Sequence, residues 1–588
     1  MPKKKLLLTG VFKPFGVSDA YGEALCTMEL LNNQVTREQG IHSPRQNNPS
    51  FGLYLLAENI LTPTTVLDFP TWKEFTKEVR NGDYTHVGIS FIVPNVLKAA
   101  RMANYVRKHS PATKILVGGH GAAIPHLRNH VDYDEVCTGE GVRWLRTYFN
   151  EPHQERAIIH PVTPSSVKKY IYGAPISDKG AIILPGVGCQ NSCRFCATAH
   201  KFEKQYTSFL REGRDLFDAC RKSEAATEAG DFSLMDENFC KMPSRAAALL
   251  AEMEAHQKAY TFSIFSSAEA ITRMGVDFLV RMGVNFVWIG VESKWNVFEK
   301  TKGVDLHALI KDIQDRGITV LASTILFMEH HDARTIEEDI DWSIGLESDL
   351  LQFMQFGPIP GTRLYQDYEV EGKLLMDIPY PEQHGQDRIW FHHPNFTLQD
   401  TSRILKEAFT RKYETHGPGI LSMAHTAVRG YLRLRDDIAF NEKNGLAWDP
   451  RLMRYVPSPE SGPDEFLRLR LESWRQYALR FRPMFWSSAA YAPNEAARKK
   501  AGMVAKLYDE AFGKMDAMDI AKSAALRVLS WKENLHLRIR QAMGLGDIMR
   551  QPPTVRQEYP DRRDSVAAGP DREKKKKRTH SSATAAAR

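Results

Sequence analysis

Residues 181–196 read AIILPGVGCQNSCRFC, and this stretch decides the interpretation of the chain. An apolar run of the kind found in buried strands ends in a glycine-containing turn. Three cysteines follow in the spacing C-x3-C-x2-C: Cys189, Cys193 and Cys196. Iron–sulfur clusters favour cysteine thiolates as ligands. Three thiolates on one tight loop can hold three irons of a [4Fe-4S] cube and leave the fourth iron open.

Zinc is the alternative for this loop. His200 extends the run to C-x3-C-x2-C-x3-H, which supplies four possible zinc ligands. Zinc sites usually place paired ligands in two separated knuckles, whereas this run is compact. It also follows the first strand of a β/α series, a context that favours the iron–sulfur cluster.

The rest of the cysteine usage points to a reducing compartment. The chain has 7 cysteines in 588 residues, a sparse and odd number that argues against a disulfide framework. We therefore expect a cytoplasmic protein. No run of about 18 apolar residues occurs, so no membrane span is expected.

Outward from the cysteines, residues 180–375 alternate between strand and helix patterns. The apolar runs AIILPGVG, DFSLMDE, YTFSIFSS, NFVWIGVES, ITVLASTILFM and LLQFMQFGPIPG are separated by helical segments. Six β/α units predict a partial or complete barrel, in which the chemistry lies at the C-terminal ends of the strands. The cysteine loop follows the first of these strands.

Residues 1–150 predict a second α/β domain, joined to the barrel by a linker at 151–179. Apolar runs at 6–10, 64–69, 86–93, 114–119 and 134–139 alternate with helical patterns, which is typical of a doubly wound parallel sheet. Ligands of such Rossmann-like sheets bind at the carboxyl ends of the strands. These ends carry Ser90, Gly118, Gly119, His120, Gly139 and Glu140.

The cysteine loop, with Phe195 before its last cysteine, resembles the radical S-adenosylmethionine (SAM) superfamily. The segments VGISFIVPN (87–95), ILVGGHGA (115–122) and CTGEGVRWL (137–145) resemble the cobalamin-binding domain that one subgroup carries. The segments FSLMDENF (232–239), WIGVES (288–293) and FGPIPGTRLY (356–365) resemble barrel strands two, four and six. The resemblance covers residues 1 to about 375.

This resemblance implies three cofactors and their contacts. The three cysteines would ligate a [4Fe-4S] cluster whose open iron chelates SAM, and reductive cleavage of SAM would yield a 5′-deoxyadenosyl radical. The residues expected to contact SAM are Asp236, Glu237, Glu292 and Ser293. Cobalamin would bind at the strand ends of residues 1–150, at Ser90, Gly118, Gly119, His120, Gly139 and Glu140.

The expected reaction is methylation of an unactivated carbon through methylcobalamin, with a flavodoxin or ferredoxin as electron donor. Radical cyclisation, rearrangement or C–C coupling without methyl transfer is a second hypothesis. A non-enzymatic corrinoid or iron–sulfur sensor is a third.

One motif of other cobalamin proteins is absent, which is compatible with this subgroup, and one segment departs from the family pattern. The chain lacks the Asp-x-His-x-x-Gly sequence that supplies an axial histidine in many cobalamin proteins. After the fifth strand, FMEHHDART (327–335) replaces a Gly-x-Pro-x-x-Thr-like turn. This places Glu329, His330 and His331 near the predicted mouth of the active site.

The remaining third is helical and basic. Residues 376–550 predict a helical domain, and residues 551–588 a disordered basic tail. Residues 401–550 carry a net charge of +9, whereas residues 1–400 carry −7. A solvated helix face, an acidic partner or an anionic lipid surface would each suit the basic third. We expect a small-molecule or lipid substrate, no nucleic-acid partner, and peripheral membrane contact as one use of this third.

Overall fold

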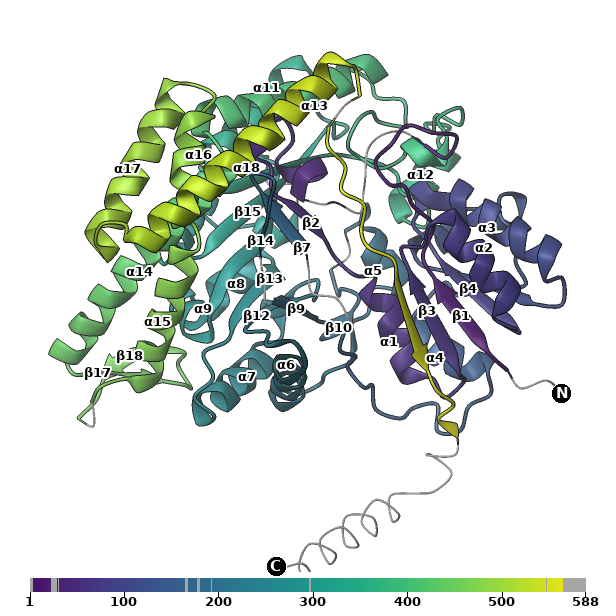
Figure 1. The fold of residues 1–588 in the computed structure, drawn as a ribbon, viewed down its shortest axis with the longest axis horizontal. Helices are drawn as coiled ribbons and strands as arrows, with labels where there is room; N and C mark the ends of the chain where they lie inside the picture. The colour runs from purple at the N-terminus through teal and green to yellow at the C-terminus, as the bar shows by residue number, and fades with distance from the viewer. Residues whose placement is uncertain are drawn as a thin grey trace, which may run out of the picture. The chain divides into compact units, whose positions relative to one another are not determined.

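The computed structural model describes residues 4–22, 29, 31–163, 168–176, 180–191, 193–295, 298–459, 462–545 and 547–563. The chain divides into two compact units (Figure 1). Unit one comprises the residues up to Pro14, Ser50–Pro161 and the chain from Pro552 onward. Unit two comprises Phe15–Pro49 and Val162–Gln551.

Unit one is built on a six-stranded sheet in the order β19-β3-β1-β4-β5-β6. The strands β1 (Leu6–Thr9), β3 (Thr64–Asp68), β4 (His86–Ser90), β5 (Lys114–Gly118) and β6 (Glu135–Val136) run parallel. The helices α1 (Phe51–Asn59), α2 (Trp72–Asn81) and α3 (Val96–His109) connect the first four of these strands, and α4 (Gly141–Tyr148) follows β6. Strands β1, β3 and most of β4 are buried, as expected where helices cover both faces of a sheet. The predicted doubly wound fold is confirmed.

The chain beyond residue 551 differs from the prediction of a disordered tail. Residues Val555–Tyr559 form β19, which pairs antiparallel with β3 and places Tyr559 opposite Thr64. Arg556 adds an ion pair to Glu78 of α2, at 2.9 Å. The pairing has a physical reason, because β3 would otherwise present an open edge to water. Residues 564–588 lie outside the described part of the chain.

Two other segments also differ from the predicted boundaries. Residues 15–49 belong to unit two, although residues 1–150 were expected to form one domain. Within that segment, β2 (Arg45–Asn47) pairs with β7 (Lys168–Ile171), which pairs with β8 (Ala174–Ile176). The expected linker at 151–179 therefore contains two strands.

The barrel of unit two is a six-stranded parallel sheet in which each strand lies beside its predecessor. Its strands are β9 (Gly180–Ile183), β12 (Asp231–Leu234), β13 (Thr261–Ser266), β14 (Val284–Glu292), β15 (Thr319–Leu326) and β16 (Leu350–Gln355). The intervening helices are α6 (Gly213–Thr227), α7 (Pro243–Ala255), α8 (Ala268–Met274), α9 (Val276–Met282), α10 (Leu306–Asp315) and α11 (Ala333–Gly345); α12 (Arg363–Val370) follows β16. The sheet ends at β9 and β16, so the predicted partial (β/α)6 barrel is confirmed.

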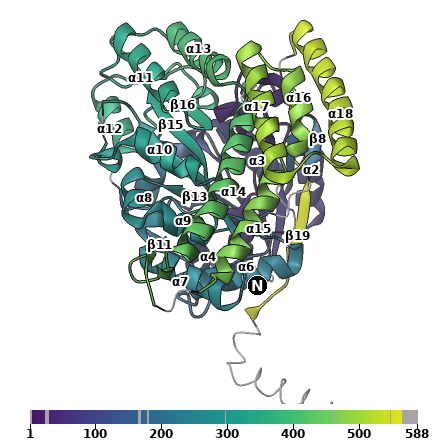
Figure 2. The same cartoon turned by 90° about the vertical axis from the view of Figure 1, so that its left-hand side faces the viewer.

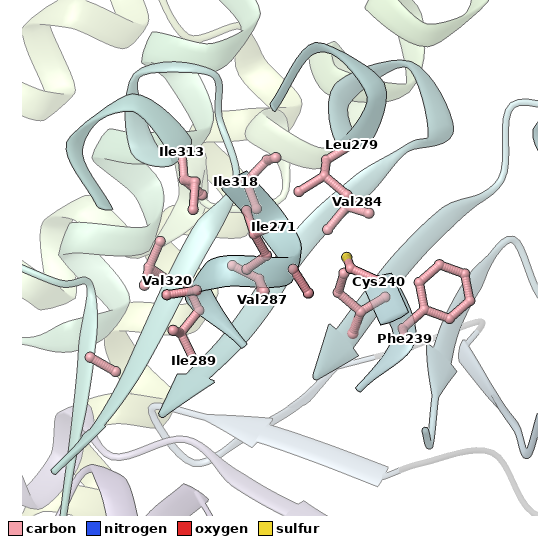
Figure 3. Close-up of a cluster of buried hydrophobic side chains, with 14 of the residues drawn as sticks. Phe239, Cys240, Ile271, Leu279, Val284, Val287, Ile289, Ile313, Ile318 and Val320 are labelled. Carbon is pink, nitrogen blue, oxygen red and sulfur yellow. The ribbon is translucent and has the colours of Figure 1, made fainter. Parts of the chain in front are cut away.

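Apolar side chains from strands and helices fill the barrel core. Figure 3 shows Val287 and Ile289 of β14 and Val320 of β15 close to Ile271 and Ile313, which come from α8 and α10. All five are at most 1% exposed. This core fixes the strand ends from which the site is built.

Helices of the last third cover part of the barrel (Figure 2). They are α13 (Leu398–His416), α14 (Gly419–Lys443), α15 (Glu465–Leu479), α16 (Phe485–Ala490), α17 (Glu495–Phe512) and α18 (Ala517–Ala542), with a hairpin of β17 (Leu446–Asp449) and β18 (Arg454–Pro457). The fully buried Arg470 of α15 donates to carbonyl groups before β13 and β14, including that of Tyr260 at 2.7 Å. The close approach of α14 requires glycine, because a Cβ on Gly430 would lie 2.0 Å from the Cα of Gly317. The predicted helical third is confirmed. No helix in the described ranges is long and apolar enough to cross a membrane.

Candidate active site

The cysteine loop follows β9 and is closed by a short antiparallel pair. Strands β10 (Gly186–Val187) and β11 (Thr207–Ser208) flank it, and α5 (Ala197–Lys201) begins directly after Cys196. Gly188, which precedes Cys189, has a φ of +92°, and a Cβ there would lie 2.1 Å from the carbonyl oxygen of Gln205. Both the backbone conformation and the close approach therefore require glycine.

The ends of other barrel strands anchor this loop. Lys241, after β12, donates to the side chain of Asn191 at 2.5 Å. Phe195 packs edge-on against Phe298, after β14, and Phe356, after β16, with ring centroids 5.1 and 6.2 Å apart. The cysteines consequently lie at the C-terminal ends of the strands, where the sequence predicted the chemistry.

The three cysteines are free and half-buried. Burial raises the pKa of each thiol, while the ammonium groups of Lys241 and Lys300 act in the opposite direction on Cys193. The backbone N–H of Asn191 donates to the Cys189 sulfur at 3.4 Å. The loop therefore offers three thiols as metal ligands. Each thiol loses its proton and binds as a thiolate when a metal is present.

A zinc site at this loop would need His200 as a fourth ligand beside the three cysteines. Elsewhere in the described part of the chain, the candidate ligand atoms of His330, His331 and Asp339 all lie within 4.8 Å of one another. The Nδ1 of His200 bonds the carbonyl of Cys196 at 3.0 Å, and its buried Nε2 has no partner. The loop carries the thiolate ligands that iron–sulfur clusters favour.

Asp236 follows β12 and is enclosed by hydrogen-bond donors. It accepts from Arg245 at 2.5 Å, from the Tyr206 hydroxyl at 2.7 Å and from the N–H of Asn238 at 3.2 Å. The side chains of Asp236 and Arg245 are each 2% exposed. This carboxylate therefore holds the end of β12 against α7. Sequence reasoning missed Arg245, although an arginine within the alanine-rich segment SRAAALLAEMEA was a signal.

Glu237, the next residue, is the acidic group beside the cysteine loop. The residue is exposed, yet desolvation of its carboxylate raises the pKa to about 7, and neighbouring Asp236 adds to the shift. The Thr198 hydroxyl of α5 bonds this carboxylate, and its charge acts on Cys189 and Cys196. A carboxylate here can receive a cationic group bound next to the loop.

Glu292, at the end of β14, is buried and forms an ion pair with the half-buried Lys300. The backbone bulges before Glu292, whose φ is +63°, an uncommon conformation for a residue with a side chain. Gly290 makes room for the pair, because a Cβ there would lie 2.8 Å from the Lys300 nitrogen. Burial alone would lower the pKa of Lys300, but Glu292, Cys193 and Cys196 raise it above its ordinary value. Lys300 was not among the predicted site residues.

Ser293 and His331 share one buried carboxylate, that of Asp339 in α11. The Ser293 hydroxyl donates to Oδ2 at 2.6 Å, and His331 Nε2 lies 2.9 Å from the same oxygen. His331 Nδ1 accepts from the N–H of Met328 at 2.9 Å, so Nε2 carries the proton. Both groups therefore fix the loops after β14 and β15.

The loop after β15 also reaches the cysteine loop. Glu329 accepts from Arg194 at 2.5 Å, which places this segment at the mouth of the barrel as expected. His330 is exposed, and its ring lies 4.3 Å from that of His331.

In unit one, the strand order reverses between β1 and β4, and sheets of this kind bind ligands at the carboxyl ends of the strands beside such a reversal. Ser90 ends β4 and Gly118 ends β5. A Cβ on Gly139 would meet no atom within 4 Å, and one on Gly118 would meet only Cys137, at 3.7 Å and beyond. Neither of these two glycines is crowded by neighbouring atoms.

The other three predicted cobalamin contacts have local structural roles. Gly119 has a φ of +86°, and a Cβ there would lie 2.4 Å from the Phe91 carbonyl oxygen. His120 begins a short 3-10 turn, His120–Ala123. Glu140 caps α4 by accepting from the N–H groups of Val142 and Arg143 at 2.5 and 2.9 Å.

The architecture of this chain is similar to that of a protein of known structure. No family model matches the chain. The radical SAM methyltransferase TsrM from Kitasatospora setae, solved with cobalamin and a [4Fe-4S] cluster, superimposes with a TM-score of 0.50 at 15% identity, over 81% of this chain and 99% of its own.

Two curated proteins are similar in sequence. An uncharacterized methyltransferase of Pyrococcus horikoshii is 20% identical, over 62% of this chain and 88% of its own length. The anaerobic magnesium-protoporphyrin IX monomethyl ester cyclase of Rubrivivax gelatinosus is 21% identical, over 48% of this chain and 58% of its own length. The chain has the fold of the cobalamin-binding radical SAM proteins.

Proposed function

We propose that this protein is a cobalamin-dependent radical SAM enzyme that methylates an unactivated carbon. The observation that carries the proposal is the loop of three free cysteines at the C-terminal end of the first barrel strand. When bound, the cofactors supply the radical and methyl-transfer chemistry, and the protein supplies binding and orientation. The methyltransferase names of the Kitasatospora and Pyrococcus proteins support methyl transfer over other radical reactions.

Cys189, Cys193 and Cys196 would hold the cluster. Three thiolates together carry negative charge, and the ammonium groups of Lys241 and Lys300 favour that charge. Gly188 holds the first cysteine in its conformation, and Phe195 fixes the second half of the loop.

Glu237 and Lys300 would bind the two charged groups at the amino-acid end of SAM. The carboxylate of Glu237 can accept hydrogen bonds from the amine, and the ammonium of Lys300 can pair with the carboxylate. Glu292 keeps Lys300 charged and positioned. Asp236 acts indirectly, because it already accepts from Arg245 and Tyr206.

Cobalamin would bind at the open strand ends of unit one. Ser90, Gly118 and Gly139 would line that site, and Gly119, His120 and Glu140 would shape its loops. Reduction of the cluster requires an external one-electron donor, for which we propose a flavodoxin or ferredoxin.

Anaerobic reconstitution of the full chain tests the proposal. We expect about four irons and four sulfides per chain, bound cobalt, and 5′-deoxyadenosine from SAM in the presence of a reductant. Changing all three loop cysteines to alanine should abolish the cluster. The matched control is Cys220→Ala, which changes a free cysteine buried in α6 and should leave the iron content unchanged.

The products separate the hypotheses. Methylated product from SAM labelled in its methyl group supports the proposal. Cleavage of SAM without methyl incorporation supports cyclisation or C–C coupling instead. A cluster that never cleaves SAM supports a sensor. Zinc in place of iron refutes both enzyme hypotheses and an iron–sulfur sensor.

A further inference from the structure

Helix α18 exposes a continuous apolar stripe to solvent. The exposed fractions are 66% for Val528, 61% for Trp531, 45% for Leu535 and 49% for Ile539. Steps of three and four residues separate these positions, so they lie on one side of the helix. A row of large apolar side chains in water marks an interaction surface.

The opposite side of α18 attaches the helix to unit two. Ser523, Ser530 and Leu537 are buried, and the Ser530 hydroxyl lies 2.9 Å from that of Ser487 in α16. The helix is therefore fixed with its apolar stripe outward, and Figure 1 shows α18 running along the outside of unit two.

The charges on α18 are divided between its two sides. Its acidic residues, Asp519 and Glu533, form ion pairs with Arg482 at 3.4 Å and Arg550 at 2.6 Å. On the outer side, Lys532 and Arg538 are exposed, and at 100° per residue they flank the apolar stripe on either edge; Lys522 is exposed as well. The outer surface therefore combines apolar and cationic side chains.

We propose that the outer face of α18 docks the protein peripherally on anionic lipid bilayers. A helix lying on a membrane surface buries apolar side chains at the boundary with the acyl chains, and cations beside them attract anionic lipids. Trp531 is of a residue type enriched at this depth, because its ring is apolar and its N–H is polar.

Charge disfavours the other occupants of this face. A second copy of α18 would bring Lys532 and Arg538 against the same two cations. The chain's own segment 572–578, REKKKKR, is also basic. Nucleic acid would suit the cations but would leave the apolar stripe in water. An anionic bilayer satisfies both sets of side chains.

Vesicle sedimentation of the full chain tests this docking. Wild-type protein should sediment with vesicles of phosphatidylcholine mixed with phosphatidylglycerol and remain in solution with phosphatidylcholine alone. The double change Lys532→Gln and Arg538→Gln should weaken binding about 30-fold, because two cations are lost near the surface. Val528→Asp with Leu535→Asp should abolish binding.

A matched control lies outside α18. Val370 of α12 is 88% exposed, so Val370→Asp also replaces an exposed apolar side chain with a carboxylate, on another part of unit two, and should not change vesicle binding. Unaltered far-ultraviolet circular dichroism and SAM cleavage without vesicles establish that each variant is folded.

Three results would overturn the proposal: no sedimentation of wild-type protein with the anionic vesicles at low salt, equal loss of binding in Val370→Asp, or a wild-type dimer that Val528→Asp with Leu535→Asp converts to monomer. The last result would assign the stripe to a second copy of the chain.

Discussion

The change Arg245→Met tests how the end of β12 is held. The Arg245 guanidinium donates to Asp236 at 2.5 Å and to Tyr206 at 2.8 Å, and both charged side chains are 2% exposed. Removing one partner of a buried ion pair leaves the other charge without compensation, at a cost of about 3–5 kcal/mol. For a unit of roughly 400 residues, that loss corresponds to a fall in Tm of about 4–6 °C.

Differential scanning calorimetry of the full chain measures this change. A chain of two units need not unfold in one step, so the transition that moves in the variant is compared with the same transition in wild type. The double change Asp236→Asn with Arg245→Met removes both charges and should recover most of the lost Tm, because the cost comes from the uncompensated carboxylate.

The double variant also separates structure from binding. If Asp236 acts only through Arg245, the double variant should still cleave SAM, whereas Glu237→Gln should weaken SAM binding. An unchanged Tm in Arg245→Met, or a double variant as unstable as the single one, would refute the reasoning.

Three further outcomes are expected. Gly188→Ala should lower the iron content after reconstitution, because its Cβ would lie 2.1 Å from a carbonyl oxygen, whereas Gly303→Ala, with a similarly positive φ but open space, should not. Burial lowers the pKa of Lys412 from its ordinary value of 10.5 to about 7. Between pH 7 and 10.5 the unfolded chain therefore binds one more proton than the folded chain, so the free energy of unfolding rises with pH across that window. Lys412→Met should flatten this rise, as measured by chemical denaturation at several pH values. Truncation after Gln551 removes β19 and should lower the Tm of unit one and promote its aggregation, measured by calorimetry and light scattering, because the edge of β3 becomes open. The first expectation would be contradicted by equal iron content in the two glycine variants. The second would be contradicted if the pH dependence of stability persisted in Lys412→Met, and the third if truncation left the Tm and aggregation of unit one unchanged.

Much of the fold could be predicted from local patterns in the sequence. Strand-length apolar runs alternating with helical periodicity identified the parallel sheets, because burial on both faces leaves a continuous apolar signature. The cysteine loop was equally readable, since its ligands are close in sequence and its glycine follows from backbone conformation at a single position.

Contacts between residues that are far apart in the chain could not be predicted from local sequence patterns. Strand β19 lies almost 500 residues from its partner β3, and VRQEY has no feature that names β3 as its neighbour. The assignment of residues 15–49 to unit two likewise depends on pairing between β2 and β7.

The same distinction applies to the site. The amino-acid sequence by itself determined which segments bear acidic groups, since Asp236, Glu237 and Glu292 each end a recognisable strand. Only the tertiary structure decided what each carboxylate does. It pairs Asp236 with Arg245 and Glu292 with Lys300, and it places Glu237 beside the cysteines. The physical reason is that a buried charge takes its role from the partner that compensates it, and that partner is chosen by packing in three dimensions.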